Sequence, residues 1–460
     1  MKTAIQRIAQ VSLLGPLLYF IPILIVTLGV SLKIFPWPFL LAWIYLPTFQ
    51  ACLLLAIFIL VASYGESYLK SSYNFLLAII LFTLYMVLVP IELGDPWKTH
   101  LANFPPKLLW GSSILAHLLY KLVYDAGLEI DDVAPIIGFF SALCFFRLFD
   151  EANICRTRNE KAFSRIFYLC TTAHLLYCRG YIEITYPSVP CAILAILFLL
   201  RFLQKFQIRD YGFALFFISL ASLIHGQNIG LLPAFPLLAI AFCLRQKEKL
   251  NFIYFSTVLI PAITIGIAIL LLRFCFHYFI VPGDIYGGQS NVPFVPARMF
   301  FSLIHPSFVA NLAYLACPAV LTIIFLYGEL SSTKRLLADP FLAISALFSL
   351  AYFCFIYIWR FDLGYPRDIH LMVSPSFPIV MLSLLALLKI RRIHAWVAYL
   401  WLGFAMLLCW ICISSLTVQG RQSGRNYLSE RSSTQYFSKN LTIRALAPER
   451  SSTFFRVVER

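Results

Sequence analysis

The first segment whose residue types could do chemistry is a pair of carboxylates. Glu92 and Asp95 stand three residues apart at the end of an apolar run, so they share one face if the helix continues that far. Gly94 and Pro96 then break the helix and turn the chain aside. Two carboxylates at such a helix end suit proton abstraction or the binding of a divalent cation, Mg²⁺ or Mn²⁺. The alternative is a solvated helix end with no chemical role.

A second segment combines a cation with an acid. Arg179 and Glu183 are four residues apart, so they could pair on one helical face. A phosphate in a binding site would explain the arginine, and a sugar hydroxyl or a metal would explain the glutamate. A structural ion pair is the alternative interpretation.

Two further segments are dense in polar residues. His225 opens the run His-Gly-Gln-Asn inside a long apolar stretch, and it could orient a substrate there. The alternative is that the run forms a plain hairpin turn. Residues 360–370 hold Arg367, Asp368 and His370, and arginine is the side chain that best clamps a phosphate. A solvated loop is the alternative here. Residues 273–306 are long enough for a mobile lid or a fixed loop.

The elements that must position these residues are set by composition. The chain of 460 residues is 61% hydrophobic and only 12% charged. A soluble core cannot hide so much apolar surface, so the composition predicts a membrane protein. It excludes a soluble globular enzyme, a disordered protein and a coiled coil. The formal net charge of +15 fits retention of positive charge at the cytoplasmic side and does not indicate a nucleic-acid partner.

The apolar runs predict an all-α, polytopic bundle of transmembrane helices. We expect about 13 spans, at 11–33, 37–63, 73–92, 133–149, 166–182, 187–203, 211–224, 229–244, 251–272, 307–327, 341–359, 372–388 and 395–416. Leucines and aromatics over 107–124 predict an amphipathic helix that lies in the membrane interface. Domain boundaries follow: an N-terminal helical pair at 1–72, a core at 73–390, a final span at 391–416 and a polar, basic tail at 417–460.

The basic residues predict which ends of these spans share a side. With the N-terminus in the cytoplasm, cytoplasmic segments hold 18 Lys and Arg residues against nine in the opposite loops before the tail. The four chemical segments then lie on the outer side. The basic tail also lies there, which argues against this count of spans. Charges that gather at one membrane face favour an enzyme over a transporter, whose sites lie near the midplane.

Taken together, these residues resemble the C-type membrane glycosyltransferases, the superfold that includes protein O-mannosyltransferases, the lipid A aminoarabinose transferase and bacterial oligosaccharyltransferases. The cluster at 92–95 and the helix at 107–124 match that family's first large outer loop, which carries an essential acid. Gly180 to Glu183 and Pro366 to Asp368 resemble motifs of uncharacterised bacterial members. The family's acidic loop follows its first span, whereas here it follows the third. The resemblance covers about residues 73–390.

The resemblance implies an inverting glycosyltransferase that takes a sugar from a polyprenyl-phosphate donor at the outer face of a bacterial cytoplasmic membrane. The acceptor would be a lipid, a glycan or a protein. Asp95 matches the family's catalytic acid, acting as general base or holding a divalent cation with Glu92 or Glu183. The remaining substrate-binding residues fall into two groups: Arg179, Arg367 and Lys98 for the phosphate, and Glu183, Tyr186, His225, Asp368 and His370 for the rest of the substrate. A multi-span transporter or lipid flippase is the alternative function.

Overall fold

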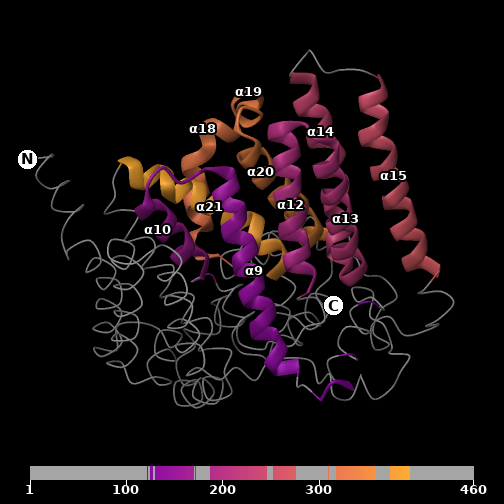
Figure 1. Cartoon of the computed structure of the whole chain (residues 1–460). Coiled ribbons are helices and arrows are strands. Elements are labelled where there is room, and N and C mark those ends of the chain that lie inside the picture. Colours follow the sequence, from indigo (N-terminus) through magenta and orange to yellow (C-terminus); the bar gives the residue numbers. More distant parts are fainter. Residues whose placement is uncertain are drawn as a thin grey trace, which may run out of the picture.

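The computed structural model describes residues 130–169, 187–245, 252–275, 317–358 and 373–393, together with 115, 122, 125–127, 171 and 309. Every regular element within these residues is a helix, which confirms the predicted all-α fold for this part of the chain (Figure 1). The predicted spans at 11–33, 37–63, 73–92 and 395–416 lie outside the described residues. So do residues 1–72 and 417–460, and the total number of spans stays a prediction.

The long helices form a bundle, and several shorter elements pack against it. The long helices are α9 (Ile130–Ala152), α12 (Ser188–Lys205), α13 (Ile208–Ile224), α14 (Ala234–Arg245), α15 (Phe252–Cys275), α20 (Pro340–Ile358) and α21 (Val373–Ile393). The shorter elements are α10 (Arg158–Leu169), α18 (Tyr327–Leu330), α19 (Thr333–Leu336) and the 3₁₀ helices η1 (Gly226–Leu231) and η3 (Pro318–Leu326). Helices α12 to α15 lie side by side and alternate in direction (Figure 1).

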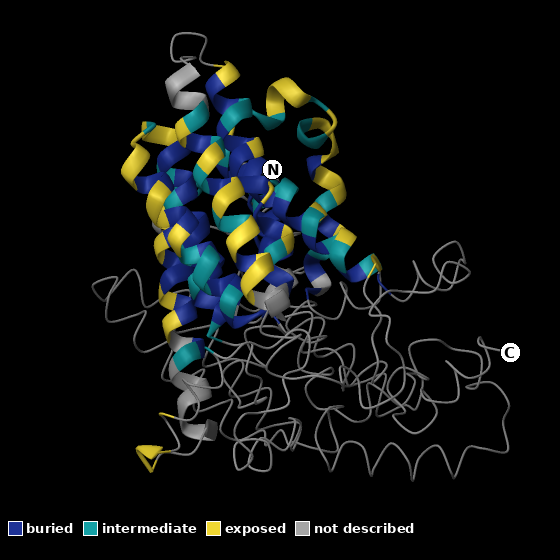
Figure 2. Ribbon diagram, turned by 90° about the vertical axis from the view of Figure 1, so that its right-hand side faces the viewer, coloured by how far each residue is buried: buried dark blue, intermediate teal, exposed yellow. Residues whose placement is uncertain are grey.

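Helix α12 is the centre of the described bundle. It contacts α9, α13, α14 and α20, and Ile196, Leu199 and Phe202 are fully buried within it. The turn into α13 is tight because Phe206 ends α12 in the left-handed conformation, with its N–H bonded to the Phe202 carbonyl. Phe202 also contacts the ring of Tyr211 on α13, so the two antiparallel helices close on shared aromatic side chains. Figure 2 shows the buried interior between the helices and the exposed outer faces.

The described helices have the length and composition needed to cross a membrane. Three stretches qualify among the described residues: Ser188–Lys205, Gln227–Arg245 and Pro340–Ile358. Large apolar side chains also cover the outside of the bundle, including Ile260, Ile263, Ile267, Leu270, Leu271 and Leu272 on α15 and Leu321 and Ile324 on η3. So broad an apolar exterior is costly in water and favourable in lipid. The chain is therefore a membrane protein.

Two elements differ from the spans that hydropathy predicts, and both differences have local causes. Helix α10 runs from Arg158 to Leu169, and it begins at Arg158 because Thr157 caps it: the Glu160 N–H donates to the Thr157 hydroxyl over 3.2 Å. Of the predicted span 166–182, residues 170 and 172–182 lie outside the described residues. In the predicted span 307–327, the described residues are Val309, Cys317, the 3₁₀ helix η3 and Tyr327 of α18. Pro318 sits at its start and leaves Cys317 in an extended conformation, as expected for a residue before proline.

The break predicted between the spans 211–224 and 229–244 is confirmed. Helix α13 ends at Ile224, η1 follows, and α14 returns in the opposite direction (Figure 1). The four residues His-Gly-Gln-Asn therefore form the start of a 3₁₀ connection rather than a simple turn.

Candidate functional site

The break after α13 carries polar side chains into the interior of the bundle. His225 is extended (φ −144°, ψ 125°), although its N–H still completes α13 by donating to the Ala221 carbonyl over 2.8 Å. The 3₁₀ helix that follows buries Gln227 and Asn228, which are 4% and 0% exposed, and His225 is 3% exposed. Polar groups at this depth must find partners or lower the stability of the fold.

Asn228 is fully engaged in hydrogen bonds. Its Nδ2 donates to the carbonyls of Ala221 and His225 over 3.2 and 3.3 Å. Carbonyls only accept, so the orientation of the amide is settled, and Oδ1 must be its acceptor end. The Tyr352 hydroxyl donates to that Oδ1 over 2.7 Å. Tyr352 lies on α20 and is 1% exposed, so this bond joins α20 to the α13–η1 connection in the core.

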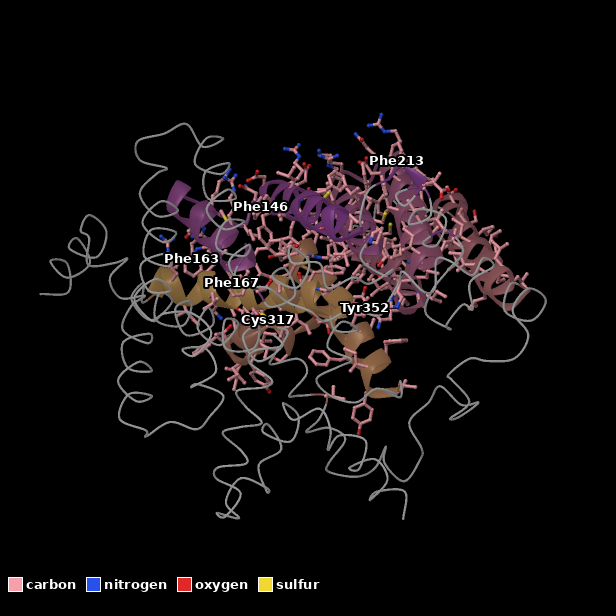
Figure 3. All side chains as sticks on the ribbon, turned by 90° about the horizontal axis from the view of Figure 1, so that it is seen from below. Phe146, Phe163, Phe167, Phe213, Cys317 and Tyr352 are labelled. Carbon is pink, nitrogen blue, oxygen red and sulfur yellow. The ribbon has the colours of Figure 1, made fainter. Side chains whose placement is uncertain are left out.

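Aromatic contacts attach two more helices to the same place. The Tyr352 ring meets the Phe377 ring of α21 edge to face, with centroids 5.9 Å apart. Phe348, one turn earlier on α20, meets Phe235 of α14 at 5.4 Å. Figure 3 views the bundle from below and shows Tyr352 beside α21, on the side of the molecule where α20 ends and α21 begins. The site is thus built by α13, η1, α14, α20 and α21 together.

Two buried side-chain oxygens at this site make no hydrogen bond with any residue that the structure describes. They are Oε1 of Gln227 and Oγ of Ser349, and both residues are 4% exposed. Ser349 precedes Tyr352 by three residues on α20, so the two share a helix face. We call His225, Gln227, Asn228, Ser349 and Tyr352 the polar cluster. It consists of hydroxyl, amide and imidazole groups and contains no carboxylate and no lysine or arginine.

His225 is the one predicted site residue that the structure describes, and it lies in the polar cluster. The other predicted residues lie outside the described residues: Glu92, Asp95, Lys98, Arg179, Glu183, Tyr186, Arg367, Asp368 and His370. The helices next to two of their segments are described, however. Helix α12 begins at Ser188, directly after the segment of Arg179, Glu183 and Tyr186, at the same end of the bundle as η1 (Figure 1).

The segment of Arg367, Asp368 and His370 connects α20 to α21. Helix α20 ends at Ile358, shortly after Tyr352, and α21 begins at Val373, shortly before Phe377. Both helix ends are therefore adjacent to the polar cluster, through the Tyr352–Asn228 bond and the Tyr352–Phe377 ring contact.

Sequence reasoning missed most of this cluster. Gln227 and Asn228 stand in the polar run that opens with His225, so a signal for them existed. Ser349 and Tyr352 lie inside the apolar run 341–359, where one serine and one tyrosine three residues apart are too common to be diagnostic.

The opposite end of the bundle carries ion pairs, and the most buried of them is centred on Glu160. Both carboxylate oxygens of Glu160 accept hydrogen bonds from Arg392 of α21, each over 3.1 Å, and Oε2 also accepts from the Arg156 N–H over 2.6 Å. Arg391 lies 3.9 Å from the same carboxylate and stacks over the Phe163 ring. Burial raises the pKa of Glu160, but the hydrogen bonds from Arg392 and Arg156 outweigh it, so this pKa lies below its ordinary value.

Other ion pairs complete this end, which we call the charged face. Glu151 of α9 pairs with Arg201 of α12 over 2.9 Å, and Glu329 of α18 pairs with Lys389 of α21 over 2.8 Å. Hydrogen bonds from Arg201 and Lys389 hold the pKa of the Glu151 and Glu329 carboxyls below their ordinary values. The Arg245 guanidinium also donates to the Leu337 carbonyl.

These contacts join chain segments that the basic residues assign to one side of the membrane. The segments are 150–165, 201–210, 245–250, 328–340 and 389–394, and the structure brings described residues from each of them to the charged face. The polar cluster lies at the other end. The alternation of sides predicted for this part of the chain therefore agrees with the arrangement of the described helices.

Neither end holds a recognisable metal centre within the described residues. No group of three His, Cys, Asp or Glu residues there could hold a metal ion. Asp95 and Glu92, the predicted ligands of a divalent cation, lie outside the described residues. The polar cluster itself offers hydroxyl, amide and imidazole groups for hydrogen bonding.

Comparison with known proteins adds no family to this description. No protein-family model matches the chain, and the search of curated proteins finds no match. The functional argument consequently starts from the polar cluster and the sequence segments attached to it.

Proposed function

We propose that the chain is a membrane glycosyltransferase that moves a sugar from a polyprenyl-phosphate donor to a lipid, glycan or protein acceptor. The observation that carries the proposal is the polar cluster, a set of buried hydroxyl, amide and imidazole groups at one end of a bundle with an apolar exterior. Polar groups at such depth cost stability, so they favour a functional role. The reaction would occur at the outer face of a bacterial cytoplasmic membrane.

The proposed reaction is a single displacement with inversion. An acceptor hydroxyl attacks the anomeric carbon of the donor sugar, and polyprenyl phosphate leaves with the electron pair of the broken C–O bond. Asp95 takes the acceptor's proton, or holds a divalent cation with Glu92 or Glu183. Arg179, Arg367 and Lys98 neutralise the leaving phosphate, which is the electrostatic contribution that usually dominates.

The remaining residues hold the sugar in place. Glu183, Tyr186 and His225 are proposed to bind its hydroxyl groups, with Asp368 and His370 in the last outer segment before the tail. The segment of Glu183 and Tyr186 adjoins the start of α12. The segment of Asp368 and His370 lies between the end of α20 and the start of α21, at the end of the bundle that holds the polar cluster.

The distribution of charge supports an enzyme over the alternative, a transporter or lipid flippase. The three membrane-length stretches among the described residues carry no Asp, Glu, Lys or Arg in their central turns. Transporters usually bind substrate near the bilayer midplane. The ion pairs of the described residues instead lie at the charged face, at one end of the bundle.

The proposal is tested by the reaction itself. The purified full-length protein in lipid nanodiscs is incubated with a panel of radiolabelled polyprenyl-phosphate sugars, with and without Mg²⁺ or Mn²⁺. We expect the wild type to release polyprenyl phosphate and Asp95→Asn to lose at least about a hundredfold in rate, the scale of a general base.

Asp125→Asn is the matched control, because Asp125 is exposed and has no proposed role. It should react at the wild-type rate. Near-normal turnover by Asp95→Asn would show that Asp95 is not the general base. Binding of the donors without turnover in any variant would favour the transporter or flippase.

A further inference from the structure

The polar cluster has hydrogen-bonding capacity that the described residues leave unused. Gln227 Oε1 and Ser349 Oγ are buried without a hydrogen-bond partner among the described residues. Tyr352 donates its one hydroxyl proton to Asn228, so its oxygen can still accept. Most buried polar groups in proteins are paired, and each exception calls for an explanation.

The two unpaired oxygens belong to elements that the Asn228–Tyr352 bond joins. Gln227 precedes Asn228 on η1, and Ser349 lies on the same face of α20 as Tyr352. The bond holds η1 against α20, so it fixes the positions of the two helices that carry Gln227 and Ser349 relative to each other.

A purely structural role does not account for the two oxygens. A buried polar atom without a partner lowers stability, whereas an apolar side chain of similar shape would not. Asn228 and Tyr352 already supply the structural bond. Gln227 and Ser349 are therefore candidates for contact with a ligand.

The unused groups define the chemistry of that ligand. The Gln227 and Tyr352 oxygens accept hydrogen bonds, and the Ser349 hydroxyl can accept or donate. Among the described residues the polar cluster includes no lysine or arginine, and its acceptor oxygens would repel a phosphate or carboxylate. A neutral group with several hydroxyls fits these requirements.

We propose that the polar cluster is a binding subsite for sugar hydroxyls, with Gln227 and Ser349 as its ligand-contacting residues and the donor's phosphate bound outside it. This inference rests on the proposed glycosyltransferase function, which it deepens by assigning the sugar and the phosphate to separate groups of residues.

The test compares binding of two probes to the full-length protein in nanodiscs: a polyprenyl-phosphate hexose and polyprenyl phosphate without a sugar. We expect the wild type to bind the glycosylated probe at least about tenfold more tightly, because sites built around hydroxyl groups discriminate strongly against ligands that lack them. Gln227→Met and Ser349→Ala should each reduce that preference to about threefold or less, with unchanged affinity for the bare carrier.

The unfolding temperature of the free protein separates this role from a structural one. Removal of an unpaired buried polar atom should leave that temperature unchanged or raise it. Gln207→Met and Ser331→Ala are the matched controls, since both residues are exposed and lie away from the cluster. They should keep the sugar preference of the wild type.

The subsite is refuted if the wild type binds both probes equally or neither, if the cluster variants keep the preference, or if they lower the unfolding temperature. The transfer assay reports on the enzyme separately. Sugar preference that depends on Gln227 and Ser349, in a protein that transfers no sugar, would uphold the subsite and remove the proposed function. Sugar transfer that depends on Asp95, combined with a sugar preference that does not change in Gln227→Met or Ser349→Ala, would uphold the proposed enzyme and refute the subsite.

Discussion

Asn228 is the residue on which the polar cluster depends. Its amide closes the end of α13 through two carbonyls, and its oxygen is reached by a hydroxyl from a residue 124 positions away. All polar atoms of its side chain are used, and the residue is fully buried. At the scale of single residues, the site is therefore a rigid hydrogen-bonded core flanked by two unpaired oxygens.

Tyr352→Phe should destabilise the protein by about 1 to 3 kcal/mol, because it leaves the Asn228 Oδ1 buried without a donor. The measurement is thermal or denaturant unfolding of the purified protein in detergent. Tyr327→Phe is the matched control, since Tyr327 is 73% exposed, and it should change stability by less than about 0.5 kcal/mol. Equal effects of the two substitutions would contradict the role given to the Tyr352 hydroxyl.

At the scale of elements, α21 links the two ends of the bundle. Near its start Phe377 packs on Tyr352, and near its end Arg392 and Lys389 hold Glu160 of α10 and Glu329 of α18. The two ion pairs differ in burial: the Glu160 side chain is 5% exposed, and that of Glu329 is 33% exposed. We therefore expect the more buried Glu160 pair to contribute more to the free energy of unfolding than the Glu329 pair does.

Glu160→Gln should lower the free energy of unfolding by about 3 kcal/mol, because it leaves Arg391 and Arg392 without their shared counter-charge. Glu329→Gln, the matched control, should cost less than about 1 kcal/mol, since its pair with Lys389 is partly solvated. Chemical denaturation of both variants under one condition makes the comparison. A larger loss of unfolding free energy in Glu329→Gln than in Glu160→Gln would contradict the greater contribution given to the buried pair.

The charged face also predicts how stability depends on pH. The pKa values of Glu151, Glu160 and Glu329 lie below their ordinary value of 4.5 in the folded protein. The unfolded chain then binds more protons, so these carboxylates stabilise the fold above about pH 4.5, and the stabilisation is lost as pH falls below it. The unfolding temperature should drop over that range, and less steeply in Glu160→Gln. A flat profile would count against these ion pairs.

At the scale of the whole molecule, the described helices separate two chemically different ends. One end is the charged face, where the five predicted cytoplasmic segments within the described residues meet, and the other end holds the polar cluster. Between them the exterior is apolar, as lipid requires. A membrane would thus hold the polar cluster and the charged face on opposite sides.

Labelling from each side of the membrane tests this arrangement. In a cysteine-free background, Arg209→Cys and Gly230→Cys are exposed at the two ends, and a Cβ at Gly230 meets no atom within 4 Å. We expect an impermeant thiol reagent to label Gly230→Cys from outside the cell and Arg209→Cys in inverted vesicles, as the excess of basic residues at the charged face requires. Labelling of both from one side would contradict the arrangement.

The sequence by itself determined the helical class, the membrane setting and the location of several spans. The predicted spans 187–203 and 341–359 match α12 and α20 closely. A continuous apolar run is a local property of the sequence, and the bilayer stabilises such a segment directly. The break at His225 was also local, since polar residues interrupt the run there. The capping of α10 by Thr157 and Glu160 was readable in the same way, yet hydropathy alone missed it.

Only the tertiary structure decided which buried polar groups meet. Asn228 and Tyr352 are 124 residues apart, and Glu160 and Arg392 are 232 apart, so no local pattern connects either pair. Their meeting depends on how each helix is rotated against its neighbours, which the packing of side chains such as Phe235, Phe348 and Phe377 sets. Composition decides that a segment lies in the membrane, but the packed bundle decides which of its polar atoms have partners.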